Sequence, residues 1–340
     1  MKQLSHAAID PSGDTGKAGD RLIVLVPVYN DWTALGRLLM RLDTCLGGTA
    51  GPVRVVVVDD GSSESDETFV SALRLDVVSN VTIVSLRRNM GHQRAIAMGL
   101  AYVEECLPCQ CVVVMDGDGE DDPADVPRLV DRMHELGDSA IVFAERTRRM
   151  EGAAFRVCYL LYRVLHRLLT GIPVKVGNFS AIPARLVRRL VVVSELWNHY
   201  AAAVFHSRIP RATIATVRRP RLHGRSKMNF VSLVGHGLSA LSVHSELLGV
   251  RLLVAGAVCA GGLLAGLAGL AWYGLSAGAA PAGWVMAGGV LGVLLLGQVV
   301  GFLAVFALTI LRGRSTSTFL PARDYAYFVE GVRTLAQSRA

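Results

Sequence analysis

Residues 111–123 are Cys-Val-Val-Val-Met-Asp-Gly-Asp-Gly-Glu-Asp-Asp-Pro, an apolar run that leads directly into carboxylates and glycines. A short β-branched run that stops in this way is typical of a buried strand followed by a loop. The loop holds more negative charge than solvation alone favours, and Mg²⁺ or Mn²⁺ would offset it. Asp116, Asp118 and Glu120 are the candidate ligands. A solvated acidic turn, with Asp122 capping the next helix, is the alternative.

The same pattern of an apolar run followed by polar residues recurs along the N-terminal half. We expect strands at 22–27, 53–58, 81–85 and 140–144 and helices near 33–43 and 92–104. Strands that alternate with helices predict an α/β domain with a mostly parallel sheet. In such sheets ligands bind beyond the carboxyl ends of the strands.

Three polar clusters follow the carboxyl ends of these predicted strands, at residues 29–31, 59–62 and 116–122. No Gly-x-Gly-x-x-Gly follows the first strand, so a dinucleotide-binding domain loses its main support. Carboxylates at strand ends can instead hydrogen-bond the base and ribose of a nucleotide, and Asp59 and Asp60 are the candidates. A turn that uses Asp and Gly for backbone reasons is the alternative for this pair.

The C-terminal part of the chain contains a long stretch without charge. Hydrophobic residues make up 51% of the 340 residues, and none of the 60 residues from 252 to 311 is charged. This length is enough for two membrane spans and a tight turn, and we place the spans at 252–274 and 284–311. A buried helical hairpin in a soluble core is the alternative. Basic residues flank both ends, so the positive-inside rule places both termini in the cytoplasm.

The net charge of +7 raises the question of a nucleic-acid partner. Because Arg and Lys gather beside apolar stretches, we expect an anionic membrane surface instead.

Residues 155–169 resemble a helix in the membrane interface, with packing on the domain core as the alternative. Five of the residues 218–227 are Arg or Lys. Phosphate is their natural partner, and lipid headgroups are the alternative.

Taken together, these motifs resemble the family 2 glycosyltransferases of the polyprenyl-phosphate (dolichol- or undecaprenyl-phosphate) sugar transferase type, from residue 22 to residue 311. The matching motifs are Val-Pro-Val-Tyr-Asn at 26–30, Asp-Asp-Gly-Ser at 59–62, Arg-Asn-Met-Gly at 88–91, Asp-Gly-Asp-Gly-Glu at 116–120 and Gly-Arg-Ser-Lys at 224–227. Glu120 stands where the family usually has Gln, and Asn178 stands where many members have Asp. The Gln-x-x-Arg-Trp signature of processive synthases is absent.

The resemblance implies a glycosyltransferase-A-like, mostly parallel sheet with flanking helices, followed by interfacial helices and a transmembrane hairpin. It implies transfer of one sugar, with inversion, from a nucleotide sugar to polyprenyl phosphate, with Mg²⁺ or Mn²⁺ as cofactor. The implied metal ligands are Asp116, Asp118 and Glu120. The implied contacts to the nucleotide sugar are Pro27, Tyr29, Asp31, Asp59, Asp60, Arg88, Gly91 and Asp116. The implied catalytic residues are Asp118, Arg221, Arg225 and Lys227.

The expected organisation follows from these assignments. It comprises a disordered tail at 1–20, a catalytic domain at 21–227, an interfacial helix at 228–250, two membrane helices at 251–312 and a cytoplasmic tail at 313–340. Small-residue spacings in the spans permit close packing within the hairpin or in a homo-oligomer. We expect a multi-pass protein of the inner (plasma) membrane with its catalytic domain in the cytoplasm.

Two other functions compete with lipid-phosphate glycosylation. A membrane-tethered transferase acting on a sugar or protein hydroxyl would need a general base opposite the metal. A catalytically inactive scaffold would not need the acidic loop.

Overall fold

The computed structural model describes residues 20–48, 51–63, 70, 72–146, 176–223, 230–276, 283–315 and 319–337. These residues form two compact units. The described residues up to 243, together with 319–337, make up the first unit. The described residues between 244 and 315 make up the second unit.

An eight-stranded sheet forms the centre of the first unit, in the order β7-β5-β6-β4-β1-β2-β3-β8. Its strands are β1 (Asp20–Val28), β2 (Val53–Asp59), β3 (Val78–Leu86), β4 (Cys109–Val114), β5 (Ile141–Arg146), β6 (Val176–Pro183), β7 (Arg211–Thr216) and β8 (Val329–Gln337). The central strands β4, β1, β2 and β3 are mutually parallel, and β7 is parallel to β5. Strand β6 is antiparallel to both of its neighbours, and β8 is antiparallel to β3.

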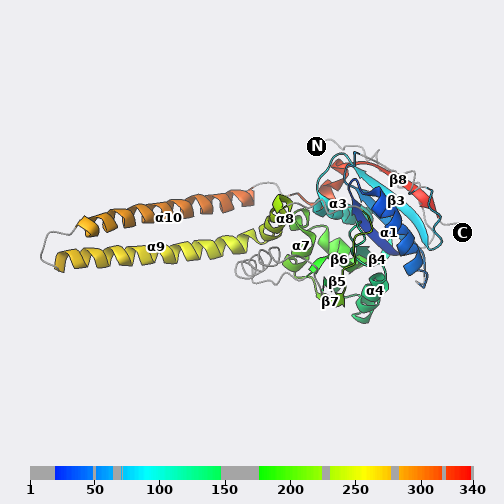
Figure 1. Ribbon diagram of the computed structural model, residues 1–340, viewed down its shortest axis with the longest axis horizontal. Coiled ribbons are helices and arrows are strands. Elements are labelled where there is room, and N and C mark those ends of the chain that lie inside the picture. The colour runs from blue at the N-terminus through cyan, green and yellow to red at the C-terminus, as the bar shows by residue number, and fades with distance from the viewer. Residues whose placement is uncertain are drawn as a thin grey trace. The chain divides into compact units, whose positions relative to one another are not determined.

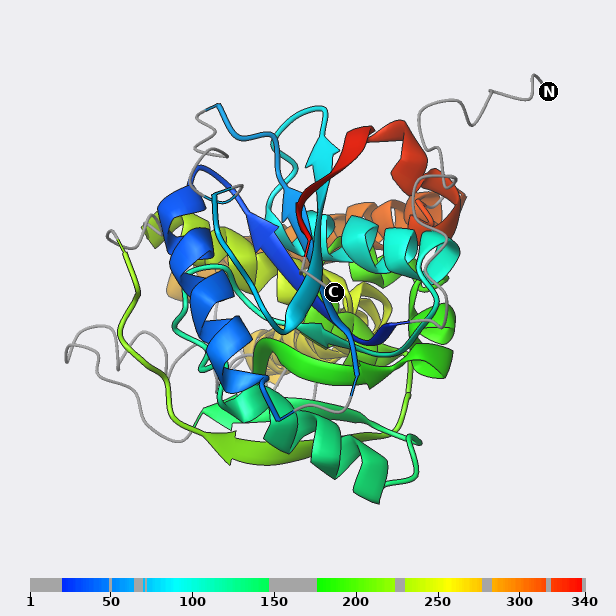
Figure 2. The same cartoon turned by 90° about the vertical axis from the view of Figure 1, so that its right-hand side faces the viewer.

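Helices cover both faces of this sheet (Figure 2). Helices α1 (Trp32–Cys45) and α4 (Asp125–Glu135) pack on one face, and α3 (His92–Cys106), α6 (Ala184–Leu190) and α7 (Tyr200–His206) pack on the other. In α1 the buried residues Leu35, Leu38, Leu39 and Leu42 recur at helical spacing and form the apolar stripe that faces the sheet. Burial on both faces explains why the central strands are almost entirely apolar.

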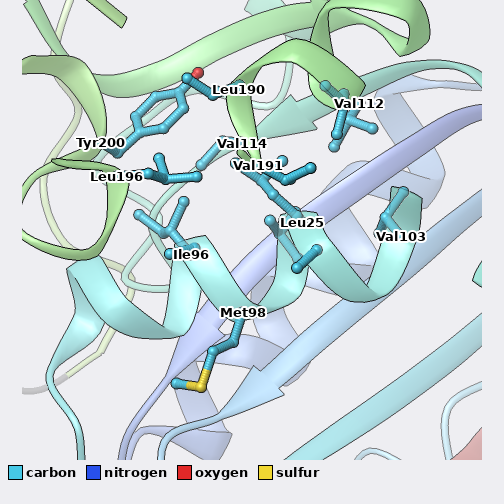
Figure 3. Close-up of a cluster of buried hydrophobic side chains, with 14 of the residues drawn as sticks. Leu25, Ile96, Met98, Val103, Val112, Val114, Leu190, Val191, Leu196 and Tyr200 are labelled. Carbon is cyan, nitrogen blue, oxygen red and sulfur yellow. The ribbon is translucent and has the colours of Figure 1, made fainter. Parts of the chain in front are cut away.

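Figure 3 shows the apolar cluster on the α3 face. Leu25 of β1 and Val114 of β4 meet Ile96 of α3, while Tyr200 of α7 closes the cluster. Tyr200 is fully buried, and its hydroxyl lies 2.6 Å from the Ser180 hydroxyl of β6. This bond satisfies the polar end of a ring that is otherwise surrounded by apolar side chains.

The predicted strands and helices of the N-terminal half are confirmed, and the sheet is mostly parallel as expected. Strands β6 and β7 were not predicted. The sequence of β6, Val-Gly-Asn-Phe-Ser-Ala-Ile-Pro, mixes turn-forming residues with apolar ones and has no clear alternation. Its antiparallel placement depends on pairing with β4 and β5, which no local pattern shows.

The C-terminal segment differs from the tail expected at 313–340. Residues 319–337 form α11 (Pro321–Asp324), η3 (Tyr325–Tyr327) and β8, which extends the sheet beside β3. Trp197 lies in η2 (Ser194–Trp197). Its ring centroid is 3.7 Å from that of Phe319 and 5.3 Å from that of Phe328. These aromatic contacts and the pairing with β3 hold the segment on the domain. Register shifts in β8 disturb its alternation, which makes the strand hard to recognise from sequence.

The second unit is a pair of long helices, α9 (Ser245–Ser276) and α10 (Gly283–Ser315), which lie side by side in Figure 1. Segments Ser245–Ser276 and Met286–Thr309 are long and apolar enough to cross a membrane. Most of their side chains are exposed rather than buried, unlike those of a core helix. The expected helix at 228–250 is divided, because α8 (Phe230–Ser242) ends before α9 begins.

Two glycines allow α9 and α10 to approach closely. A methyl group on Gly256 would lie 2.4 Å from Leu303, and one on Gly292 would lie 2.7 Å from Leu267. By contrast, nothing lies within 4 Å of the Cβ positions that would be built on Gly262, Gly266, Gly297 and Gly301. The closest approaches in the hairpin are therefore at Gly256 and Gly292, while the Cβ position of Gly288 would make an ordinary contact with Leu270 at 3.9 Å.

Candidate active site

The polar clusters predicted from sequence meet at one edge of the sheet. Strands β4, β1 and β2 are adjacent and parallel, so the loops that follow them begin side by side. Two backbone bonds join these loops to β1. The Asp60 N–H donates to the Val28 carbonyl at 2.8 Å, and the Met115 N–H donates to the Leu25 carbonyl at 3.1 Å. This edge is where an open α/β sheet binds its ligands.

The loops after β1 and β2 are fastened to each other. Asn30 has a positive φ of 49°, and its N–H donates to the Ser62 hydroxyl at 2.9 Å. Its side chain donates to the Ser63 hydroxyl at 3.0 Å and accepts from the Ser63 N–H at 2.9 Å. The Ser62 N–H donates in turn to Asp59 Oδ1 at 3.0 Å. Asp59 therefore shapes its own turn. Tyr29, the residue before Asn30, is 42% exposed.

Asp60 joins the second motif to the third. Its two carboxylate oxygens accept the N–H groups of Met90 and Gly91 at 2.6 and 2.8 Å. Burial raises the pKa of Asp60 to about 6, and these two bonds oppose that rise. Gly61 has a φ of 69°, and a Cβ there would lie 2.5 Å from the Arg88 carbonyl carbon. The motif at 59–62 thus supports the motif at 88–91, and Gly91 precedes α3 with a φ of 90°.

The acidic loop after β4 has different partners. Asp116 Oδ1 accepts a hydrogen bond from Asn178 Nδ2 at 3.1 Å, and Asp118 Oδ1 accepts from the Glu120 N–H at 3.0 Å. A Cβ on Gly117 would lie 3.1 Å from the carbonyl oxygen of Pro27, so this glycine lets the acidic loop pass close to β1. Pro27 therefore borders the site through its backbone.

Arginines from the segment after β7 lie along the acidic loop. Arg218 pairs with Glu120, and Arg219 pairs with Asp122. Arg221 Nη2 lies 3.3 Å from an oxygen of Asp31 and 3.4 Å from Asp118 Oδ2. Backbone bonds reinforce this arrangement: the Arg219 N–H donates to the Glu120 carbonyl at 2.9 Å, and the Leu222 N–H donates to the Asp118 carbonyl at 3.0 Å.

Comparison with known families identifies this sheet and its loops. Residues 23–191 match the sequence profile described as "Glycosyl transferase family 2". The chain carries a domain of glycosyl transferase family 2. The predicted resemblance to this family is confirmed over these residues.

Relatives of this family 2 domain include two proteins named undecaprenyl-phosphate 4-deoxy-4-formamido-L-arabinose transferase. The one from Shewanella sediminis is 28% identical over 254 residues, which cover 73% of this chain and 74% of the relative. The one from Klebsiella pneumoniae is 26% identical over 219 residues, which cover 63% of this chain and 64% of the relative.

A solved structure shares the fold of the family 2 domain. Glucosyl-3-phosphoglycerate synthase from Mycobacterium tuberculosis, in complex with Mn²⁺, UDP-glucose and phosphoglyceric acid, superimposes with a TM-score of 0.50 at 19% identity. The match covers 68% of this chain and 80% of the synthase. At this identity the likeness shows the fold alone, and the fold agrees with the predicted glycosyltransferase-A-like architecture.

The donor set of the family 2 domain suits a divalent ion that is completed by substrate. Among the residues that the structure describes, no three acidic, His or Cys side chains converge as a metal site. Glu120, expected as a third ligand, pairs with Arg218, and its role as a ligand stays a prediction. Mg²⁺ is commonly held by one or two carboxylates together with water and substrate phosphates, and Asp116 and Asp118 provide two carboxylates.

Several predicted site residues remain predictions. Arg225 and Lys227, with the rest of the motif at 224–227, lie outside the described residues, as does the helix expected at 155–169. The assignment of Asp59, Asp60, Arg88 and Gly91 to the nucleotide sugar is likewise untested.

Sequence reasoning missed two partners of the site. Arg41 of α1 lies 3.2 Å from Asp122, and Gln93 of α3 donates to Asn178 at 3.0 Å. Neither residue belongs to a pattern that marks it in the sequence.

Proposed function

We propose that this protein transfers one sugar, with inversion, from a nucleotide-sugar donor to a polyprenyl phosphate at the cytoplasmic face of the membrane. The observation that carries the proposal is the acidic loop after β4, lined by arginines, in a chain that also has two helices of membrane-spanning length. The names of the relatives, which are undecaprenyl-phosphate sugar transferases, support the same reaction.

Asp116 and Asp118 are the proposed holders of the divalent ion, with the donor diphosphate completing its ligands. When bound, the ion neutralises negative charge on the diphosphate and makes it a better leaving group. Asp31 and Asp118 both contact the guanidinium of Arg221. This contact places a cation beside the proposed diphosphate position, where Arg221 can bind a phosphate oxygen.

The acceptor phosphate needs little help from a base. The second pKa of a phosphate monoester is near 6, so the attacking oxygen already carries negative charge at neutral pH. The side chain opposite Asp116 on β6 is the amide of Asn178, which cannot act as a base. A hydroxyl acceptor would require such a base. Arg221, Arg225 and Lys227 are proposed to bind the phosphate of the donor or of the acceptor.

The test is an assay of the purified full-length protein in detergent with undecaprenyl phosphate and a panel of radiolabelled nucleotide sugars. We expect one donor to yield label in the organic phase as an acid-labile lipid-linked sugar. The matched control is Asp118→Asn, which should form this product about 10³-fold more slowly. Label that appears only on added sugars or peptides would replace this proposal with the hydroxyl-acceptor function. A lack of product with every donor and acceptor would favour the scaffold.

A further inference from the structure

A chain of hydrogen bonds joins helix α7 to the acidic loop. The backbone N–H of Tyr200 donates to Gln93 Oε1 at 2.6 Å. Gln93 Nε2 donates to Asn178 Oδ1 at 3.0 Å, and Asn178 Nδ2 donates to Asp116 Oδ1 at 3.1 Å. Gln93 and Asn178 are only 7% and 6% exposed. The chain connects four separate elements, namely α7, α3, β6 and the loop after β4.

The direction of this chain follows from its first member. A backbone N–H can only donate, so the atom of Gln93 that faces Tyr200 must be its carbonyl oxygen. The NH₂ group of Gln93 then faces Asn178, which must present its own carbonyl oxygen. The NH₂ group of Asn178 is thereby directed to Asp116. This assignment of both amide groups rests on the hydrogen-bond network.

His92 contacts both side-chain amides of this network. Its Nε2 lies 2.7 Å from Gln93 Nε2 and 3.3 Å from Asn178 Nδ2. Both neighbours are amide NH₂ groups whose other hydrogen is already directed along the chain. His92 Nε2 is therefore the acceptor, and the ring proton lies on Nδ1. Rotation of either amide would place a donor against a donor inside the protein.

The sheet register places Asn178 at the level of Asp116. Strands β4 and β6 are antiparallel, and their ladder ends with Val114 paired to Ser180. Two positions beyond this pair, Asp116 follows the end of β4 and lies at the level of Asn178 in β6, so the two residues continue the same register. Residues opposite each other in an antiparallel pair have side chains within reach of one another. The contact is therefore set by the sheet and not by a loop alone.

We propose that Asn178, held by Gln93, is a positioning residue for the metal-binding carboxylate of Asp116. Its amide holds Oδ1 with an uncharged donor and leaves Oδ2 to bind the ion. A carboxylate at this position would repel Asp116 and supply no donor. Partners that orient a metal ligand commonly affect metal affinity or activity by about 10–100-fold. The inference rests on the proposed function, because it takes Asp116 as a metal ligand.

The test measures binding of Mn²⁺ alone to the full-length protein in detergent, from the electron paramagnetic resonance signal of free Mn²⁺. We expect Asn178→Leu to weaken Mn²⁺ binding by about 10–100-fold, since it keeps the shape but removes the donor. Gln93→Leu should weaken it less, because Asn178 keeps its contact but loses its support. Thr82→Val is the matched control. Its hydroxyl is also buried and accepts from Arg54 on the neighbouring strand, so its loss should leave Mn²⁺ affinity unchanged.

The outcomes separate this inference from the proposed function. If Asp116→Asn loses Mn²⁺ while Asn178→Leu binds it as the wild type does, the positioning role is overturned and the metal site stands. If Thr82→Val weakens binding as much as Asn178→Leu, the effect is general destabilisation, and the positioning role is again overturned. If the wild type binds no Mn²⁺ either alone or with a saturating nucleoside diphosphate, the proposed metal site fails together with this inference.

Discussion

Two groups of carboxylates lie at the same edge of the sheet, but they are satisfied in different ways. Asp59, the last residue of β2, and Asp60 accept hydrogen bonds from the backbone N–H groups of Ser62, Met90 and Gly91. In the loop after β4, Asp118, Asp121 and Asp122 also accept local backbone bonds, from the N–H groups of Glu120, Asp116 and Ala124, but the remaining partners described for this loop are side chains. These partners are Asn178 for Asp116, Arg221 for Asp118, Arg218 for Glu120, and Arg219 and Arg41 for Asp122.

The two kinds of partner indicate two roles for these carboxylates, one in holding loops together and one in binding substrate. Backbone donors are fixed with the chain, so a carboxylate that holds them shapes loops and cannot release them without unfolding its surroundings. Arginine side chains can rotate, so their carboxylates can exchange a guanidinium for a metal ion or release it to a phosphate. We therefore infer that Asp60 acts mainly through the loops it holds, whereas Asp118 acts through its contacts with substrate. The following predictions test this contrast.

The largest effect is expected at Asp118. Asp118→Asn keeps the size of the side chain but removes its charge, so the transfer rate should fall by about 10³-fold with little change in unfolding temperature. The measurement is the initial rate of lipid-linked sugar formation, with removal of divalent ions by EDTA as a parallel test. Glu120→Gln is the matched control and should change the rate only a few-fold, because Glu120 faces Arg218. Full activity of Asp118→Asn, or of the wild type in excess EDTA, would exclude the metal role.

The effect of Asp60 is expected in the free energy of unfolding rather than in the transfer rate. Burial raises its pKa from 3.8 to about 6, so between these values the folded protein binds a proton that the unfolded chain has released. The contribution of Asp60 to the free energy of unfolding is therefore highest below pH 3.8, falls as the pH rises to 6 and is constant above it. At 1.36 kcal/mol per pKa unit the total fall is about 3 kcal/mol.

This dependence is isolated by comparing the wild type with Asp60→Asn, whose side chain does not titrate. The free energy of unfolding of the wild type, relative to that of Asp60→Asn, should fall by about 3 kcal/mol between pH 3.5 and pH 7. A difference that stays constant over this range would show that Asp60 is not buried as described.

The third effect concerns the arginine segment. Arg221 contacts both Asp31 and Asp118, so Arg221→Ala should lower the transfer rate about a hundred-fold, close to 2.7 kcal/mol. Arg218→Ala is the matched control and should lower it only a few-fold. Rates are measured in detergent micelles with saturating polyprenyl phosphate, which removes the surface potential of the bilayer. Equal and mild losses in both variants would show that the segment is a general basic surface.

Much of the fold could be predicted from local pattern. The apolar runs that became β1 to β5 are buried on both faces, and burial selects apolar residues over most of their length. The charge-free stretch predicted both α9 and α10, because a helix that crosses the hydrocarbon core of a bilayer needs about 20 consecutive apolar residues. The acidic loop was visible because such a density of carboxylates is costly without partners.

The sequence by itself determined these elements and the position of the acidic loop, because burial and charge density act on neighbouring residues. Tertiary structure alone decided the partners of that loop. Asn178 lies 62 residues from Asp116, and Arg219 lies 97 residues from Asp122. Such contacts arise from the order and register of β4, β6 and β7, which depend on long-range pairing. For the same reason the C-terminal residues became β8: an edge strand is defined by the strand it pairs with, and here that strand is β3.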